Sequence, residues 1–156
     1  MQLSSRFTIA VHIFACIDTF EKEHKLTSEF LAGSVNVNPV VIRRLLQQLK
    51  AAGLIHVARG SGGAKAARPL DEITFLDIYR AVESVENGEL FHFHDNPNSK
   101  CPVGRTIHKV LDPKLQRVQE AMENELKSIT LADIKEEMSG YLCDVDKEAV
   151  KVKESR

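Results

Sequence analysis

A group of basic side chains without acidic neighbours is the first feature of this 156-residue sequence that could do chemistry. Residues 36–70 contain no Asp or Glu, and their six basic residues are Arg43, Arg44, Lys50, Arg59, Lys65 and Arg68. This window carries a formal charge of +6 in a chain whose net charge is −1. Concentrated positive charge in a nearly neutral chain is typical of a protein with a polyanionic partner. The alternative is a solvated basic surface that has no partner.

Cys101 is the second candidate, because its position favours a reactive thiolate. It directly precedes Pro102, which predicts that it occupies the N-cap of a helix, where backbone N–H groups stabilise negative charge. Lys100 and Arg105 add positive charge nearby. Such a thiol can be oxidised to a sulfenic acid or a disulfide, with Cys143 as the candidate partner. The alternative is an unreactive, half-buried thiol.

Histidines just before this helix form a weaker candidate site. His92 and His94 would project to one side of an extended segment, where Asp95, Cys101 and His108 could join them around a metal ion. Short histidine-containing loops are more often only polar. The sequence therefore predicts no bound metal and no cofactor.

Other function classes lack their signatures in this sequence. It contains no nucleotide-binding glycine motif, no G-x-S-x-G and no H-E-x-x-H, so we predict that the protein is not an enzyme. Its three cysteines include no C-x-x-C pair, and Cys16 is expected in an apolar core. The longest apolar run, residues 9–17, is too short to cross a bilayer and has no basic leader. We expect a cytoplasmic protein with free thiols and no membrane association.

The basic window lies within a predicted winged helix-turn-helix. Apolar residues spaced by three and four predict helices over residues 5–20, 28–34, 39–52 and 75–84. Asn36 suits the left-handed backbone of a sharp turn, and Asn38-Pro39 combines an N-cap with proline at the first helical position. Strands over 54–57 and 64–68, joined by a glycine-rich turn, predict a wing. We expect a mainly α fold with a small β-hairpin wing, and a DNA-binding domain over residues 1–85.

The second half of the chain is predicted to contain a long helix that packs against another helix. Residues 86–101 are assigned to a polar loop, a candidate sensor, and a helix begins near Pro102. A near-heptad apolar seam follows, formed by Leu111, Leu115, Val118, Met122, Leu126 and Ile129. Its partner is either the helix over 5–20 or the same helix of a second subunit. We assign 102–140 to dimerisation helices, the last capped by Thr130 and ending near Met138, and 141–156 to a charged tail.

Several motifs, in this order and spacing, resemble a known family. They are Met1-Gln-Leu-Ser-Ser-Arg6, Asn38-Pro39, Leu45-x-x-x-Leu49-Lys50-x-Ala52-Gly53-Leu54, Arg59-Gly60-x-Gly62-Gly63 and Glu72-Ile73-Thr74-x-x-Asp77-Ile78-x-Arg80-Ala81-Val82. Weaker matches continue to about residue 140, with Cys101-Pro102-Val103-Gly104 and Thr130-Leu131-Ala132-Asp133-Ile134. Through these motifs the chain resembles the winged-helix regulators typified by IscR, CymR and NsrR, the Rrf2 family.

The resemblance implies a dimeric bacterial transcription factor. The helix over 39–52 would enter the major groove, the wing would enter the minor groove, and the helix near 113–128 would hold the dimer. The residues that would face DNA by position are Asn38, Val40, Arg43 and Arg44 on the helix, and Arg59, Ser61, Gly62, Gly63 and Lys65 on the wing.

The sequence departs from the family pattern in two places. It has Ala64-Lys65-Ala66 where relatives often carry an aromatic residue. Several members bind an iron–sulfur cluster through three cysteines in the loop before the long helix, but here this loop offers only Cys101. We therefore expect no cluster.

These observations together predict a dimeric repressor that binds a pseudo-palindromic DNA operator. A redox or electrophile signal would act through Cys101. One alternative is a regulator that senses a small ligand or metal near His92 and His94. Another is a winged helix used only for protein–protein contact, which predicts little salt-sensitive affinity for DNA.

Overall fold

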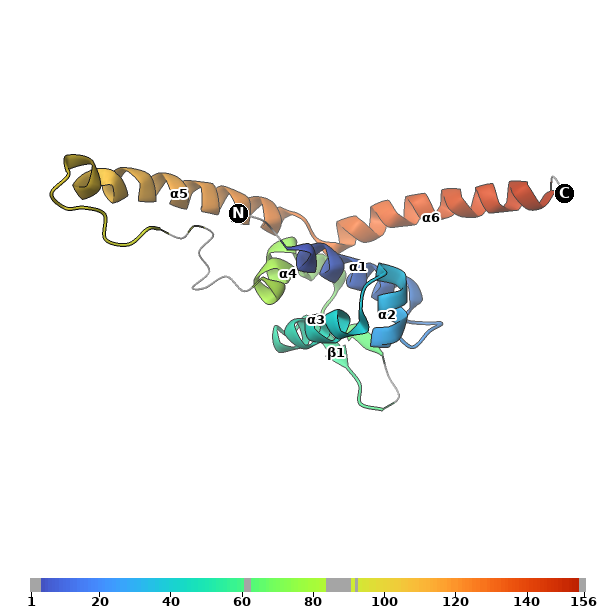
Figure 1. The fold of residues 1–156 in the computed structure, drawn as a ribbon. Helices are drawn as coiled ribbons and strands as arrows, with labels where there is room; N and C mark the ends of the chain where they lie inside the picture. Colours follow the sequence, from blue (N-terminus) through green and yellow to red (C-terminus); the bar gives the residue numbers. More distant parts are fainter. Residues whose placement is uncertain (1–3, 61–62, 84–90, 92, 155–156) are drawn as a thin grey trace.

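The elements of the fold follow the order expected from the sequence. The computed structural model describes residues 4–60, 63–83, 91 and 93–154, with side chains described up to residue 143. In chain order the elements are α1 (Ser5–Phe20), α2 (Ser28–Val35), α3 (Pro39–Ala51), β1 (Ile55–Val57), β2 (Ala64–Ala66), the short 3-10 helix η1 (Leu70–Glu72), α4 (Phe75–Val82), α5 (Pro102–Ser128) and α6 (Leu131–Glu154). The expected fold class, mainly α with a small antiparallel hairpin, is confirmed. In Figure 1, α5 and α6 run away from each other, and the N-terminal domain lies below the point where they meet.

One apolar core is formed by helices α1, α2, α3 and α4, the hairpin and the first residue of α6. The predicted stripe of α3 is buried in it and consists of Ile42, Leu45, Leu46 and Leu49. α1 contributes five buried residues, Ala10, Ile13, Phe14, Cys16 and Ile17, so the expectation that Cys16 belongs to the core is confirmed. Burying a side chain of this size stabilises a fold by about 1.5–3 kcal/mol. The same burial turns the polar residues of α3 outward.

The last helix is longer than the sequence predicts. α6 continues from Leu131 to Glu154, whereas we expected it to end near Met138. Gly140 directly precedes the segment that we predict as a charged tail, but one glycine inside a helix costs only about 1 kcal/mol relative to alanine. The flanking residues are rich in Glu, Lys and Ala, which favour a helix, and this preference outweighs the single glycine.

None of the described helices is long and apolar enough to span a membrane.

A backbone bridge attaches the junction of α5 and α6 to the N-terminal domain. Phe75 donates its backbone N–H to the carbonyl of Ile129 at 2.9 Å, and Leu131 donates to the carbonyl of Ile73, also at 2.9 Å. The two segments pair here as in an antiparallel ladder. Because Phe75 is the first residue of α4, a displacement of the two long helices would act directly on the start of α4.

The apolar seam of α5 is only partly covered within one chain. None of the residues of α5 is buried, and Val118 is 53% exposed. α5 packs against α4, where Arg80 Nη2 and Glu123 Oε2 form an ion pair at 3.1 Å. The partner expected within the chain was the helix over 5–20, but α1 packs against α6 instead. The same helix of a second subunit thus remains the expected partner of the seam.

Gly63 is required where the wing approaches the α1–α2 loop. A Cβ atom at this position would overlap the backbone of Leu26, and the next residue, Ala64, donates its N–H to the Leu26 carbonyl at 3.2 Å. We expect Gly63→Ala to lower the free energy of unfolding by about 1–3 kcal/mol, as overpacking does against backbone that cannot yield. Urea denaturation measures this. The matched control is Gly33→Ala, where the space around the added methyl is open, so equal losses in both variants would contradict the assignment.

Candidate nucleic-acid interface

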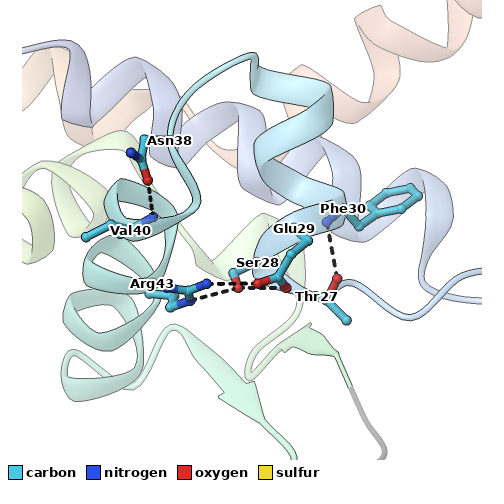
Figure 2. Close-up of polar contacts among 7 residues, drawn as sticks. All are labelled: Thr27, Ser28, Glu29, Phe30, Asn38, Val40 and Arg43. Carbon is cyan, nitrogen blue, oxygen red and sulfur yellow. Dashed lines mark hydrogen bonds and ion pairs between the residues drawn. The ribbon is translucent and has the colours of Figure 1, made fainter.

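A sharp turn between α2 and α3 presents the first turn of α3 to solvent. Asn36 adopts the predicted left-handed conformation, with φ 60° and ψ 50°. Asn38 is the predicted N-cap of α3, and its Oδ1 accepts a hydrogen bond from the backbone N–H of Val40 at 2.9 Å (Figure 2). Pro39 occupies the first helical position. Val40 has an apolar side chain that does not belong to the core, and it is 61% exposed.

The two adjacent arginines of α3 have different surroundings. Arg43 reaches across to the first turn of α2, where its Nη2 lies 2.9 Å from Glu29 Oε1 and its Nε donates to Ser28 Oγ at 3.3 Å (Figure 2). Arg44 is exposed and makes no ion pair or hydrogen bond with the residues that the structure describes. Of the two, only Arg44 therefore has its full set of donors available to a partner.

A groove of about 310 Å³ lies between the start of α2, α3 and the wing. Its polar lining comes from Thr27, Ser28, Arg43, Gln47 and Lys50. Two of these side chains are cationic, and the lining contains no acidic residue. A groove of this charge suits a phosphate backbone better than a neutral or cationic ligand.

The wing carries the remaining basic residues expected at the interface. Arg59 lies in the turn after β1, and Lys65 lies on β2 directly opposite His56. Gly60 has φ +81°, a conformation that requires glycine or a strained residue. Gly63 makes its close approach to the backbone of Leu26. Two further predicted contact residues, Ser61 and Gly62, lie outside the described residues.

The tertiary structure gives two residues of the basic window acidic partners from other segments. Glu29 pairs with Arg43, and Asp77 of α4 lies 4.0 Å from Arg68. The Arg43 guanidinium lowers the pKa of Glu29, with backbone and Ser28 hydrogen bonds adding to the effect. Sequence reasoning missed Glu29 because it lies seven residues before the window. The usable signal was the helix-turn-helix itself, which packs the start of α2 against α3.

Cys101 occupies the predicted N-cap of α5, with Pro102 at the first helical position. The backbone N–H groups of Gly104 and Val103 lower the pKa of its thiol, because they stabilise the thiolate. Cys101 is half-buried and Cys143 is exposed. They lie on helices that diverge from their junction (Figure 1). At 1.5 Å per residue of α5, Cys101 lies about 40 Å from that junction. The Cα atoms of a disulfide are only ~6 Å apart, so Cys101 and Cys143 of one chain are too far apart to form a disulfide.

The histidine contacts in the structure are made by His94, His108 and Asp112, whereas we expected His92 and His94 with Asp95, Cys101 and His108. The rings of His94 and His108 lie 5.2 Å apart, and both ring nitrogens of His108 are engaged. Its Nδ1 lies 3.0 Å from Asp112 Oδ1, and its Nε2 lies 3.2 Å from the backbone carbonyl of His94. His92 lies outside the described residues. The part of the chain that the structure describes contains no group of three His, Cys, Asp or Glu side chains placed to hold a metal.

The fold and this surface define the class of protein. A helix-turn-helix with an exposed second helix, followed by a two-stranded basic wing, is a winged-helix module of the DNA-binding type. A profile of the Rrf2 family, described as an iron-dependent transcriptional regulator, matches residues 3–137. The HTH-type transcriptional regulator YwnA of Bacillus subtilis is 45% identical over 132 residues, which covers 85% of this chain and 96% of YwnA. The chain belongs to the Rrf2 family of transcriptional regulators.

Solved structures agree with this assignment. A crystal structure described as that of a DNA-binding protein matches with a TM-score of 0.67 and 39% identity, covering 84% of this chain and 99% of the other. IscR of T. potens matches with a TM-score of 0.64 at 24% identity, over 88% of each chain. CymR of B. subtilis matches with a TM-score of 0.61 at 21% identity, over 86% of this chain and 95% of CymR. The last two bear on the fold alone.

The iron named in the family description does not fit the thiols of this chain. A protein-bound cluster is usually held by several cysteine thiolates that converge on one point. Here Cys16 is 3% exposed in the N-terminal core, whereas Cys101 and Cys143 lie on different helices that run apart. These are the three cysteines of the chain. We therefore assign no step to a cysteine-bound cluster.

Proposed function

We propose that the protein is a cytoplasmic, dimeric repressor that binds a specific DNA operator through α3 and the wing. The observation that carries the proposal is the exposed N-terminal half of α3. It presents Val40 in its first turn and Arg44 in its second beside a cationic groove, and Arg44 forms no ion pair with any described residue. In the major groove, an apolar side chain such as Val40 fits the methyl group of thymine, and an arginine fits the acceptor edge of guanine or a phosphate. Asn38 acts as the cap that holds this turn in place.

The wing and the groove supply the phosphate contacts in this proposal. Arg59 and Lys65 would reach the minor groove from the hairpin, together with Ser61, Gly62 and Gly63 by position. Arg43 and Lys50 line the groove between the wing and α3, where one DNA strand would pass. Contacts of this kind set the register of the protein and make its affinity depend on salt.

We expect Arg43→Ala, Arg44→Ala and Arg59→Ala each to weaken binding to a duplex selected from a random library. The loss is about 1–3 kcal/mol where the residue reads a base, and a flatter salt slope where it holds a phosphate. Fluorescence anisotropy at several salt concentrations measures both quantities. Lys135→Ala on α6 is the control, since this residue pairs with Asp18 far from the interface. If all three arginine variants bind as the parent does, the assignment of the DNA surface is wrong.

The proposed dimer rests on the seam of α5. Its residues Leu111, Leu115, Val118, Met122 and Leu126 lie on one side of a helix none of whose residues is fully buried within the chain. A two-fold symmetric dimer would cover these residues with their counterparts from a second copy. It would also place two α3 helices on one side of a duplex, which favours a pseudo-palindromic operator with half-sites about one helical turn, or a multiple of it, apart.

We expect the double substitution Leu115→Glu and Met122→Glu to convert the dimer into monomers, because it places like charges opposite each other in the seam. Light scattering measures the mass, and binding curves on a two-half-site duplex measure cooperativity. Arg117→Glu, on the opposite side of α5, is the control and should leave the mass unchanged. A parent protein that is already monomeric would contradict the proposal.

The proposed signal is oxidation of Cys101. Hypochlorous acid, a two-electron oxidant, transfers Cl⁺ to the thiolate, giving a sulfenyl chloride and hydroxide. Water then displaces chloride and leaves a sulfenic acid. A thiol of a second copy, Cys101 or Cys143, can then attack the sulfenic sulfur, forming a disulfide and releasing water. A bond between copies at the start of α5 would shift the long helices, whose junction is bonded to the start of α4.

We expect hypochlorite to weaken binding of the selected duplex by the parent, and dithiothreitol to restore it. Cys101→Ser should not respond, and Cys143→Ser distinguishes the two disulfide partners. Because the folded pKa of Cys101 lies below its ordinary value, its alkylation by iodoacetamide should persist to lower pH than in urea, and should fall only as pH drops through the lowered pKa. A Cys101→Ser variant that responds like the parent would overturn this proposal.

A further inference from the structure

Glu29 is an acidic side chain placed at the edge of the proposed DNA-binding surface. It lies in the first turn of α2, next to Thr27 and Ser28, which line the cationic groove. Its side chain is 64% exposed, and that of Arg43 is 54% exposed. The pair is therefore reachable by a ligand.

The contacts of Arg43 show what a phosphate would have to replace. Glu29 Oε1 takes one guanidinium N–H at 2.9 Å, and Ser28 Oγ takes a second at 3.3 Å. Ser28 in turn donates to Glu29 Oε2 at 3.0 Å, so the three side chains form one closed set. Carboxylates and phosphates use the same donors of an arginine. A DNA phosphate that approaches Arg43 must displace Glu29 or share the guanidinium with it against charge repulsion.

We propose that Glu29 is a negative determinant of DNA affinity, a residue that competes with DNA phosphates for Arg43. The inference rests on the proposed DNA-binding function. Affinity for random DNA comes almost entirely from phosphate contacts, so competition at Arg43 weakens it directly. At the operator, contacts of α3 with base edges add free energy, but they do not lower the cost of separating Glu29 from Arg43. Glu29 therefore lowers affinity for random DNA and affinity for the operator by similar factors.

The first test compares the parent with Glu29→Gln, which keeps the size of the side chain and removes its charge. The probes are a duplex selected by the parent from a random library and a duplex of scrambled sequence. We expect the scrambled duplex to bind about three- to fivefold more tightly, the effect of one exposed charge contact. Its salt slope should become steeper by roughly 0.9, the value for one added phosphate contact. Binding of the selected duplex should strengthen by a similar factor, because Arg43 meets a phosphate in both complexes.

Two controls separate this role from a general change of charge. Glu137→Gln removes the same charge from an exposed position on α6 and should leave both affinities unchanged. Glu29→Gln should also have no effect in an Arg43→Ala background, because the guanidinium for which Glu29 and phosphate compete is then absent. The proposal is overturned if Glu29→Gln leaves the affinity for scrambled DNA unchanged, or raises it equally without Arg43. If the parent selects no duplex at all, the proposed function itself fails.

Discussion

The burial of one side of α3 is the constraint on which the rest of this structure depends. Ile42, Leu45 and Leu49 are each no more than 1% exposed, and a helix that commits these positions to the core has no freedom to rotate. Rotation by one residue would expose at least one large apolar side chain and cost about 1.5–3 kcal/mol. The outward direction of Val40 and Arg44 follows from this packing. A recognition surface thus needs no separate stabilisation, because the core already orients it.

The second constraint is the backbone bridge between the α5–α6 junction and the start of α4. Its hydrogen bonds involve main-chain atoms, so they fix the long helices to the domain regardless of side chains. α4 in turn packs against α1 and α3. Displacement of the long helices would therefore pass to α3 through packed elements. This continuity gives a physical route from a thiol at the start of α5 to the proposed DNA surface.

Charge on the N-terminal domain is organised in pairs as well as in a patch. The basic window looks uniform along the sequence, but folding places Glu29 beside Arg43 and Asp77 beside Arg68. Arg44, Arg59 and Lys65 form no ion pairs among the described residues. Neighbouring arginines in α3 therefore differ in what they can offer a ligand, and the difference arises from α2.

Caps and apolar spacing act over a few residues, so the local elements could be predicted without the structure. The N-cap of Asn38, the left-handed Asn36 and the buried stripe of α3 were all predicted and are confirmed. Local rules misplaced the end of α6, because a single glycine is a weak signal within a strongly helical segment. Which helix covers which became known from the packing of the folded chain. It brought Glu29 to Arg43, directed α1 to α6 and separated Cys101 from Cys143. These contacts join residues far apart in the chain, and their geometry depends on the whole packing of the core, which no local pattern encodes.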